Sequence, residues 1–444
     1  MRTNPVADTE ARDPAQQDVD SPVEKLIIEG GKTLSGRVEV AGSKNAVLAI
    51  LPAFLLAPGK SHLTAVPNLR DVQSMVRLLE HLGATVEEGP GTLAVDASTL
   101  TSHEAPYKIV SKMRASFYVL GPLLARLGKA RVSLPGGCAW GPRPVNLHLE
   151  GLRALGAEME VDHGYVVAKA DRLRGGRVHF DVSSVGATAH IMMAAALAEG
   201  ITEISNAACE PEVVALAECL QAMGVAIEGA GTSTMTVHGE SELHPVSFRN
   251  IPDRIEAGTY MIAGAMAGGE IEIANVIPEH LTAAIGKLGA AGADFWVDGE
   301  SVYVRRRGRL TGINVSTDIH PGFPTDLQAQ MVAALSVADG ASLITDSIYH
   351  DRFAHVAELR RLGANIVVKG NSATVIGVDA LSGTYVQSKD LRASASLVLA
   401  GLVADGETHV THIHHLDRGY ESLETKLRGL GASIRRVEDP NGDA

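Results

Sequence analysis

The sequence predicts an α/β (α+β) protein of two domains, each built from three copies of one helix-and-strand unit. The first observation is a Leu-Gly-Ala pattern or a close variant, with glycines at intervals of 73, 68, 68, 71 and 68 residues, namely Gly83, Gly156, Gly224, Gly292, Gly363 and Gly431. The second is a set of alanine-rich, nearly uncharged stretches that end at intervals of 69, 72, 69, 71 and 66 residues, near Gly59, Gly128, Gly200, Gly269, Gly340 and Gly406. Two interleaved periods of about 70 residues indicate a sixfold internal repeat.

Each unit is expected to contain a buried helix, a strand, an amphipathic helix and further strands. The alanine-rich stretches are apolar on most sides, so they predict helices that are buried on most sides. Each Leu-Gly-Ala glycine follows an amphipathic helical pattern, such as residues 76–81, and stands where a helix C-cap belongs. A short alternating run, such as residues 365–368, then predicts a strand. A chain of 444 residues is too long for one core, so the six units divide into two domains of three.

Composition and charge exclude several classes of function. The formal net charge of -13 argues against a general nucleic-acid-binding protein, although local arginines can still bind small anions. The three cysteines, Cys138, Cys209 and Cys219, are too few for a disulfide framework or a cysteine-rich zinc site. The most apolar run, residues 46–57, is short and contains Pro52, so it predicts a core helix and no membrane insertion. We therefore expect a cytoplasmic protein.

The residues just before the buried helices suggest a ligand site. Lys44, Arg114, Ser184 and Arg254 follow one another at intervals of 70 residues, and Asp326 and Arg392 continue the series at 72 and 66. Equivalent positions of a repeat lie together, so each domain gathers three helix N-termini, which attract phosphate and carboxylate groups. Helix capping explains the serines and aspartates but not the basic residues, which favours a binding site.

Residues 134–144 predict a shaped loop, because three glycines and three prolines in this stretch exclude a helix or a central strand. Cys138 is flanked by small residues, and Arg143 nearby favours its thiolate and could hold an anionic substrate beside it. An ordinary surface turn is the alternative for this loop taken alone.

Eight motifs follow one another along the chain, namely Gly-Ser-Lys44-Asn45-Ala, Lys-Met-Arg114-Ala-Ser, Pro-Gly-Gly-Cys138-Ala-Trp-Gly-Pro-Arg143-Pro-Val, Ser-Val185-Gly-Ala-Thr, Pro-Asp-Arg254-Ile-Glu, Phe-Pro-Thr-Asp326-Leu-Gln-Ala-Gln, Asp-Leu-Arg392-Ala-Ser-Ala-Ser and Asp417-Arg418-Gly-Tyr. With these motifs in this order, the chain resembles the UDP-N-acetylglucosamine 1-carboxyvinyltransferases, enolpyruvyl transferases of the EPSP synthase superfamily, from about Ile27 to Val437. The resemblance implies two domains, each an inside-out α/β barrel of three units. The expected division is a disordered tail at 1–24, one domain from 25–43 and 252–438, a second from 44–251 with the Cys138 lid loop, and a C-terminal tail at 439–444.

The resemblance also implies the roles of individual residues. The phosphoenolpyruvate site is expected to contain Lys44, Asn45, Arg143 and Arg418. The UDP-N-acetylglucosamine site is expected to contain Asn45, Arg114, Arg143, Pro144, Val145, Asn146, Leu147, Ser184, Val185, Asp326 and Ile348. The expected catalytic residues are Cys138 as general acid on a mobile lid, Asp326 as proton acceptor, and Lys44 and Arg418 as charge-neutralising groups. Arg392, with Asp390 beside it, is expected to close on the lid.

The implied reaction transfers the enolpyruvyl group of phosphoenolpyruvate to the 3-hydroxyl of UDP-N-acetylglucosamine by addition and elimination, as the first committed step of peptidoglycan synthesis. This scheme requires no metal and no organic cofactor. Five residues depart from those usual in the family, namely Trp140, Asn146, Val182, Cys209 and His350.

Three alternatives bear on this interpretation. The sister enzymes that act on shikimate 3-phosphate share the fold and the cations but lack a cysteine loop of this kind, which disfavours them. A catalytically weak relative that binds a UDP-sugar as a regulator is disfavoured by Cys138, Asp326, Lys44 and Arg418 together. His412, His414 and His415 are expected to lie on a strand with exposed histidines, because alternation would send them to opposite faces, rather than to form a metal site.

Overall fold

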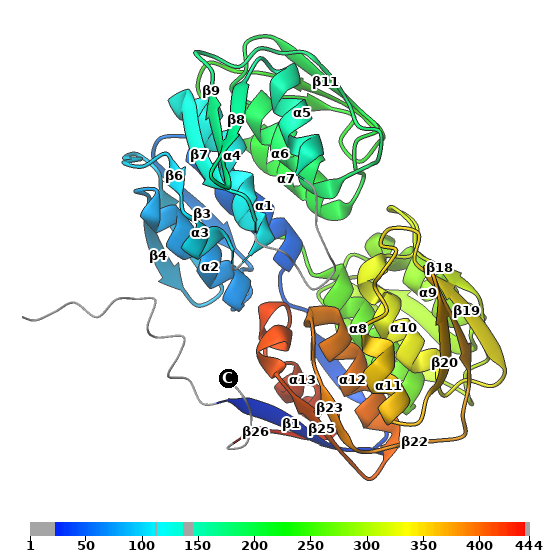
Figure 1. The fold of residues 1–444 in the computed structure, drawn as a ribbon. Coiled ribbons are helices and arrows are strands. Elements are labelled where there is room, and N and C mark those ends of the chain that lie inside the picture. The colour runs from blue at the N-terminus through cyan, green and yellow to red at the C-terminus, as the bar shows by residue number, and fades with distance from the viewer. Residues whose placement is uncertain (1–22, 112, 136–144, 440–444) are drawn as a thin grey trace, which may run out of the picture.

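The computed structural model describes residues 23–111, 113–135 and 145–439. The chain forms two lobes with separate hydrophobic cores (Figure 1). The core of the first lobe is drawn from residues 46–243, and that of the second lobe from residues 26–40 and 255–434. The cores fall on either side of the predicted domain boundaries, and the boundaries themselves stay a prediction.

Three alanine-rich helices lie together in the middle of each lobe, and the sheets lie around them (Figure 1). In the first lobe these inner helices are α1 (Lys44–Ala53), α4 (Leu120–Leu127) and α6 (Val185–Ala195). In the second lobe they are α8 (Arg254–Ala267), α10 (Gln328–Leu335) and α12 (Leu391–Val403). Such helices can be buried on all sides because small side chains allow close packing and almost no charge needs water. This confirms the predicted inside-out α/β fold.

Each unit has a second helix, and 3-10 turns lead into several helices. The second helices are α2 (Arg70–His81), α5 (Asn146–Ala154), α7 (Pro211–Ala222), α9 (Thr282–Ala290), α11 (His355–Arg361) and α13 (Leu423–Gly429), with a short α3 (Tyr107–Val110). The 3-10 segments are η1 (Phe54–Leu56), η2 (Arg114–Val119), η3 (Pro278–Leu281), η4 (Thr325–Leu327) and η5 (Ile413–Arg418). Positive φ angles at the Leu-Gly-Ala glycines, such as 101° at Gly83, explain why glycine follows these second helices.

Six four-stranded sheets of one topology occur in the described residues, consistent with a sixfold repeat. In each, the strand after the inner helix pairs with one parallel neighbour and one antiparallel neighbour, which itself pairs with a fourth, antiparallel strand. In the first lobe the sheets are β14 (Ser247–Arg249), β3 (Lys60–Thr64), β5 (Thr92–Asp96) and β4 (Thr85–Gly89); β6 (Glu104–Ala105), β7 (Lys129–Ser133), β9 (Tyr165–Lys169) and β8 (Glu158–Asp162); and β10 (Arg177–His179), β11 (Ile201–Ser205), β13 (Thr234–His238) and β12 (Ala226–Glu228).

In the second lobe the four-stranded sheets are β16 (Ala293–Asp298), β17 (Ser301–Arg306), β15 (Glu270–Ala274) and β2 (Gly36–Glu39); β18 (Val315–Ser316), β19 (Ala341–Thr345), β21 (Ser372–Ile376) and β20 (Asn365–Lys369); and β23 (Tyr385–Gln387), β25 (Glu407–Thr411), β1 (Glu24–Glu29) and β26 (Ser433–Glu438). A small parallel pair joins β22 (Leu381–Ser382) and β24 (Ala404–Asp405). The last four-stranded sheet contains both ends of the described chain, since Ile27 stands opposite His409 and Arg435.

The inner ends of both predicted tails take part in the described structure, and the tail boundaries themselves stay a prediction. Glu24 already belongs to β1, where it pairs with Glu438 of β26. At the other end, Asp439 is buried, and its carboxylate forms a 3.0 Å ion pair with Lys25. The two ends of the described chain pair in one sheet, which explains why these residues are ordered. Composition alone does not reveal such pairing.

The lobes are joined where two chain segments run side by side. The Ser43 N–H donates to the Ile251 carbonyl at 2.6 Å, and the Asp253 N–H donates to the Ala41 carbonyl at 2.9 Å. Gly42 lies between them, and a Cβ atom there would stand 1.7 Å from the Ala65 carbonyl oxygen. The crossing therefore requires glycine at this position, and it places the start of α1 beside the start of α8.

The strand predicted for the three neighbouring histidines is wrong. β25 ends at Thr411, His412 has a left-handed backbone with φ of 57°, and His414 and His415 lie in the 3-10 segment η5. A left-handed residue breaks the strand geometry, so the alternation of faces stops there. The described ranges contain no cluster of three or more His, Cys, Asp or Glu residues suited to a metal ion. Within the same ranges, no helix has the length and apolar character needed to cross a bilayer.

Candidate active site

Lys44 and Arg418, the two described cations of the predicted phosphoenolpyruvate site, meet across the lobes on one carboxylate. Lys44 begins α1 in the first lobe, and Arg418 ends η5 in the second. Asp71, in the first turn of α2, accepts from the Lys44 Nζ at 2.7 Å and from the Arg418 Nε at 2.9 Å. The side chains of Lys44 and Asp71 are only 10% and 6% exposed, whereas that of Arg418 is 34% exposed.

Burial and neighbouring charges shape this cluster. Burial lowers the pKa of Lys44, the Asp71 carboxylate opposes that shift, and Arg392 and Arg418 add to it. Burial by itself would raise the pKa of Asp71, but Lys44 and Arg418 outweigh burial, and the pKa is lowered. The cluster is therefore an ion-paired site with more positive than negative groups, which suits an anionic ligand.

A second cluster is centred on Asp326 in η4. Its Oδ1 accepts from the Arg352 Nη2 and its Oδ2 from the Arg392 Nη2, both at 2.8 Å. The two arginine side chains are almost buried, and the Asp326 side chain is 26% exposed. Arg352 also donates to the Thr325 hydroxyl, and Arg392 donates to the Tyr420 hydroxyl at 3.3 Å.

The two arginines decide the protonation of Asp326. Burial would raise the pKa of this carboxyl group, but Arg392 and Arg352 hold it far below its usual range. A carboxylate held in this way is a weak base. Asp326 can therefore accept a proton from a substrate only when at least one guanidinium group has turned to another anion.

Arg254, at the start of α8, forms a second contact between the lobes. Glu212 of α7 accepts from the Arg254 Nε and Nη2 at 3.1 Å each, and both side chains are largely buried. The same carboxylate accepts from the Asn45 amide at 3.4 Å. Burial would lower the pKa of Arg254, but Glu212 reverses this shift. The helix-start cation expected to bind a ligand is thus paired with Glu212.

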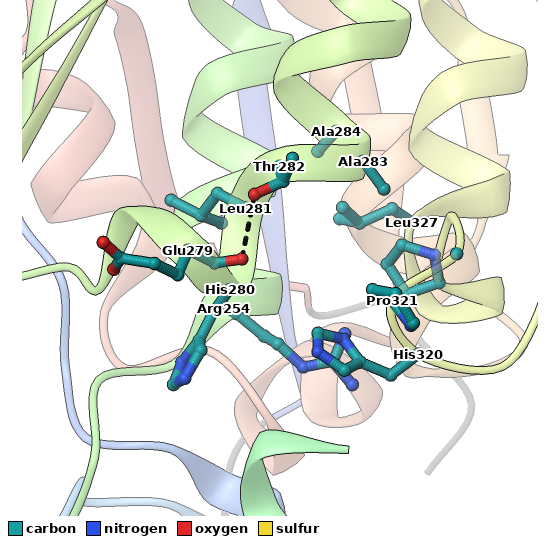
Figure 2. Close-up of a pocket in the computed structure, with 12 residues that line it drawn as sticks. Arg254, Glu279, His280, Leu281, Thr282, Ala283, Ala284, His320, Pro321 and Leu327 are labelled. Carbon is teal, nitrogen blue, oxygen red and sulfur yellow. Dashed lines mark hydrogen bonds between the residues drawn. The ribbon is translucent and has the colours of Figure 1, made fainter. Parts of the chain in front are cut away.

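A small hollow lies beside Arg254, on the side of α8 and η3 (Figure 2). Figure 2 shows the rings of His280 and His320 on either side of Arg254, with Leu327 at the edge of the hollow. The pKa values of both histidines are lowered, mainly by burial and then by Arg254. These rings are therefore neutral at physiological pH, where they can donate or accept a hydrogen bond.

Capping accounts for two serines and two aspartates at the inner helix starts. Ser43 and Ser184 accept the Ala46 and Ala187 N–H groups at 3.3 Å, and Asp253 caps α8. Asp390 accepts the Arg392 N–H at 2.8 Å, and burial raises its pKa. Asp390 is thus the cap of α12, and the partner of Arg392 is Asp326; the lid contact predicted for this pair stays a prediction.

The described residues of the predicted UDP-sugar site are spread over several elements of the two lobes. Those in the first lobe are Asn45 on α1, Arg114 at the start of η2, Val145, Asn146 and Leu147 at the start of α5, and Ser184 and Val185 at the start of α6. In the second lobe, Ile348 is 37% exposed and its N–H donates to Asp346 at 3.0 Å. Their role in binding stays a prediction.

Cys138, Trp140, Arg143 and Pro144 lie outside the described residues. The two described cysteines are poor nucleophiles. Burial raises the pKa of Cys219 to about 12, and burial and Glu210 raise that of Cys209. Both shifts disfavour the thiolate form, which is the reactive form, at these two positions.

Sequence reasoning missed Asp71, Glu212 and Arg352. Asp71 looks like an ordinary acidic residue in the first turn of an amphipathic helix, which the helix dipole favours in any protein. Glu212 looks the same at the start of α7. Arg352 lies two residues after His350, one of the five departures, and nothing in the sequence connects it with Asp326.

Comparisons with known proteins show the family of the chain. The profile of the EPSP synthase (3-phosphoshikimate 1-carboxyvinyltransferase) family matches residues 28–427. A UDP-N-acetylglucosamine 1-carboxyvinyltransferase of Desulfosudis oleivorans is 54% identical over 94% of this chain and 100% of its own length. The enzyme of the same name from Geotalea uraniireducens is also 54% identical with the same coverage.

Solved structures show the same fold. The enolpyruvyl transferase NikO from Streptomyces tendae superposes with a TM-score of 0.85 at 26% identity, covering 95% of this chain and 100% of that one. An EPSP synthase from Acinetobacter baumannii reaches 0.73 at 18% identity, covering 94% of this chain and 100% of its own, which speaks for the fold alone. With this fold and identity above half along nearly its whole length, the chain belongs to the UDP-N-acetylglucosamine 1-carboxyvinyltransferase family of the EPSP synthase superfamily.

Proposed function

We propose that the protein transfers the enolpyruvyl group of phosphoenolpyruvate to the 3-hydroxyl of UDP-N-acetylglucosamine and releases phosphate, as the first committed step of peptidoglycan synthesis. The observation that carries the proposal is the meeting of Lys44 and Arg418 across the lobes, in a chain whose relatives bear the name of this enzyme. Both proposed substrates are soluble anions, so the proposal places the reaction in the cytoplasm.

The proposed addition step joins the 3-hydroxyl oxygen of the sugar to C2 of phosphoenolpyruvate, while C3 takes a proton from Cys138. Lys44, Arg143 and Arg418 hold the phosphate and carboxylate charges as the tetrahedral intermediate forms. In the elimination step the C2–O bond to phosphate breaks and C3 returns a proton to the Cys138 thiolate. The product keeps the enolpyruvyl ether, and phosphate leaves.

Asp326 is proposed to accept the hydroxyl proton of the sugar. Its two ion pairs, with Arg352 and Arg392, make it a weak base in the free protein. The proposal therefore requires that bound substrate anions draw one guanidinium group away. This gives a physical reason for both substrates to be present before the chemistry starts.

The test measures inorganic phosphate released from phosphoenolpyruvate in the presence of UDP-N-acetylglucosamine, with shikimate 3-phosphate in a parallel assay. Phosphate release with UDP-N-acetylglucosamine as acceptor, and none with shikimate 3-phosphate, supports the proposal. Turnover only with shikimate 3-phosphate would assign the protein to the sister activity. Clear UDP-sugar binding with no phosphate release would instead support the alternative of a catalytically weak relative that binds a UDP-sugar as a regulator.

A further inference from the structure

Asp71 occupies a position that none of the proposed catalytic steps uses. It is buried at the seam between the lobes, yet it contacts two side chains of the proposed anion site. Each oxygen faces one cation, with Oδ2 2.7 Å from the Lys44 Nζ and Oδ1 2.9 Å from the Arg418 Nε. The first turn of the twelve-residue helix α2 holds the carboxylate in place, and the helix dipole stabilises its negative charge there.

The environment of Lys44 explains what this carboxylate does. Lys44 is buried, and two further cations face it, Arg392 from α12 and Arg418 from η5. Asp253, at the start of α8, is a second acidic group beside Lys44, and its carboxylate accepts the backbone N–H of Lys44 at 3.0 Å and also caps α8. Asp71 is the carboxylate in direct contact with the ammonium group.

The two contacts of Asp71 differ in exposure. The Lys44 side chain is 10% exposed, and that of Arg418 is 34% exposed. An incoming phosphate can therefore reach Arg418 more easily than Lys44, and the Lys44–Asp71 pair can persist while Arg418 exchanges its partner. The Glu212–Arg254 pair differs from this arrangement. Both oxygens of the Glu212 carboxylate accept from the one guanidinium group of Arg254, whereas Asp71 is shared between two cations.

We propose that Asp71 is a positioning residue of the anion site, which keeps the buried Lys44 ammonium charged and aimed between the lobes so that it can bind the phosphate group of the substrate. This inference rests on the proposed function only for the identity of the anion. Without Asp71, a buried ammonium beside two guanidinium groups loses its proton at a lower pH.

The experiment measures the affinity of the intact protein for inorganic phosphate by calorimetry, from pH 6.5 to 10, in the wild type, Asp71→Asn and Asp71→Glu. In Asp71→Asn the pH at which phosphate affinity falls should move down by about one to three units, the size expected for removing an opposite charge in direct contact. Asp71→Glu retains the charge and should stay close to the wild type. Glu358→Gln is the matched control, since it removes a carboxylate of α11 that is buried and paired with Lys389 and Arg361 without touching Lys44, and it should leave this pH unchanged.

Other results would overturn the inference. An Asp71→Asn protein that binds phosphate with the wild-type pH dependence, whether weaker or tighter, would show that Asp71 serves stability or merely competes with the anion. An equal shift in Glu358→Gln would show that the effect comes from the loss of any buried carboxylate. If Asp71→Asn fails to fold, as judged by circular dichroism, the smaller uncharged Asp71→Ser replaces it, with the same expected shift.

The two proposals fail separately. A normal rate of phosphate release from phosphoenolpyruvate with no pH shift in Asp71→Asn would refute the role of Asp71 and leave the enzyme assignment intact. A pH shift without any turnover would support Asp71 as the counter-ion of an anion site and refute the proposed reaction. A wild type that binds no phosphate would overturn the anion site and the role of Asp71 together.

Discussion

Replacing Asp326 by asparagine tests the proposed base while keeping the size of the side chain. Asp326 now receives one hydrogen bond from each of two arginines, both at 2.8 Å. The amide of asparagine can accept one of these bonds, but its NH2 group faces the other guanidinium. The change therefore removes the proton acceptor and also leaves two nearly buried cations without their counter-ion.

The loss of the proton acceptor and the loss of the counter-ion are measured by different assays. Loss of a positioned general base lowers kcat by about 10² to 10⁴-fold, because the hydroxyl proton then has no acceptor. Breaking a buried ion pair by removing one partner costs about 3–5 kcal/mol; we expect the low end, since the Asp326 side chain is 26% exposed. Steady-state phosphate release gives kcat and the KM for phosphoenolpyruvate, and urea denaturation gives the loss of stability.

Glu358→Gln separates chemistry from stability. Glu358 is a buried carboxylate of α11 in the same lobe, paired with Lys389 at 3.4 Å and with Arg361 at 3.5 Å. Its loss should lower stability while the folded fraction keeps its kcat. The reasoning is refuted if Asp326→Asn retains the wild-type kcat and only raises KM, because Asp326 would then bind or cap and not accept the proton.

Two further predictions concern the cysteines and a buried histidine. Fosfomycin, the epoxide that traps the lid thiol of this family, should alkylate Cys138, and peptide mass spectrometry that finds the label on Cys209 or Cys219 would contradict this assignment. Cys138→Ser should lose most turnover while keeping UDP-sugar binding, and wild-type activity of the variant would contradict the proposed proton transfer. Burial lowers the pKa of His190 from 6.5 to about 3, so the unfolded chain binds a proton below pH 6.5 that the folded protein does not. The free energy of unfolding should therefore fall as the pH drops from 6.5 towards 3, by about 1.4 kcal/mol per pH unit from this group, and urea denaturation of His190→Gln should show a slope shallower by that amount. Parallel wild-type and variant curves would refute the assignment.

The repeat made the fold predictable from the sequence. Markers of buried helices and of helix ends recur in one phase, and such periodicity survives in any tertiary context. The closure of one sheet by β1 was not predictable, because it joins residues near the two ends of the described chain. The His412 turn was missed because alternation gives no sign that one residue will adopt a left-handed backbone.

Part of the candidate site was predicted from the sequence, and the part that was missed includes the counter-ion Asp71. The repeat and the motifs identified Lys44, Asp326 and Arg392 at inner helix starts, where the structure places them. Asp71 was missed although it touches Lys44, because its other partner, Arg418, is 347 residues away in the chain. A counter-ion is recognised by what it faces, and that information appears only when the two lobes are in place.

The most direct test of the account is a crystal structure of the protein with UDP-N-acetylglucosamine and phosphoenolpyruvate, or an unreactive analogue of it. We expect the phosphate group between Lys44 and Arg418, and the Asp326 carboxylate within hydrogen-bond distance of the 3-hydroxyl, with one of its two arginines displaced. Phosphate bound away from these two cations, or a sugar whose 3-hydroxyl lies beyond the reach of Asp326, would contradict it.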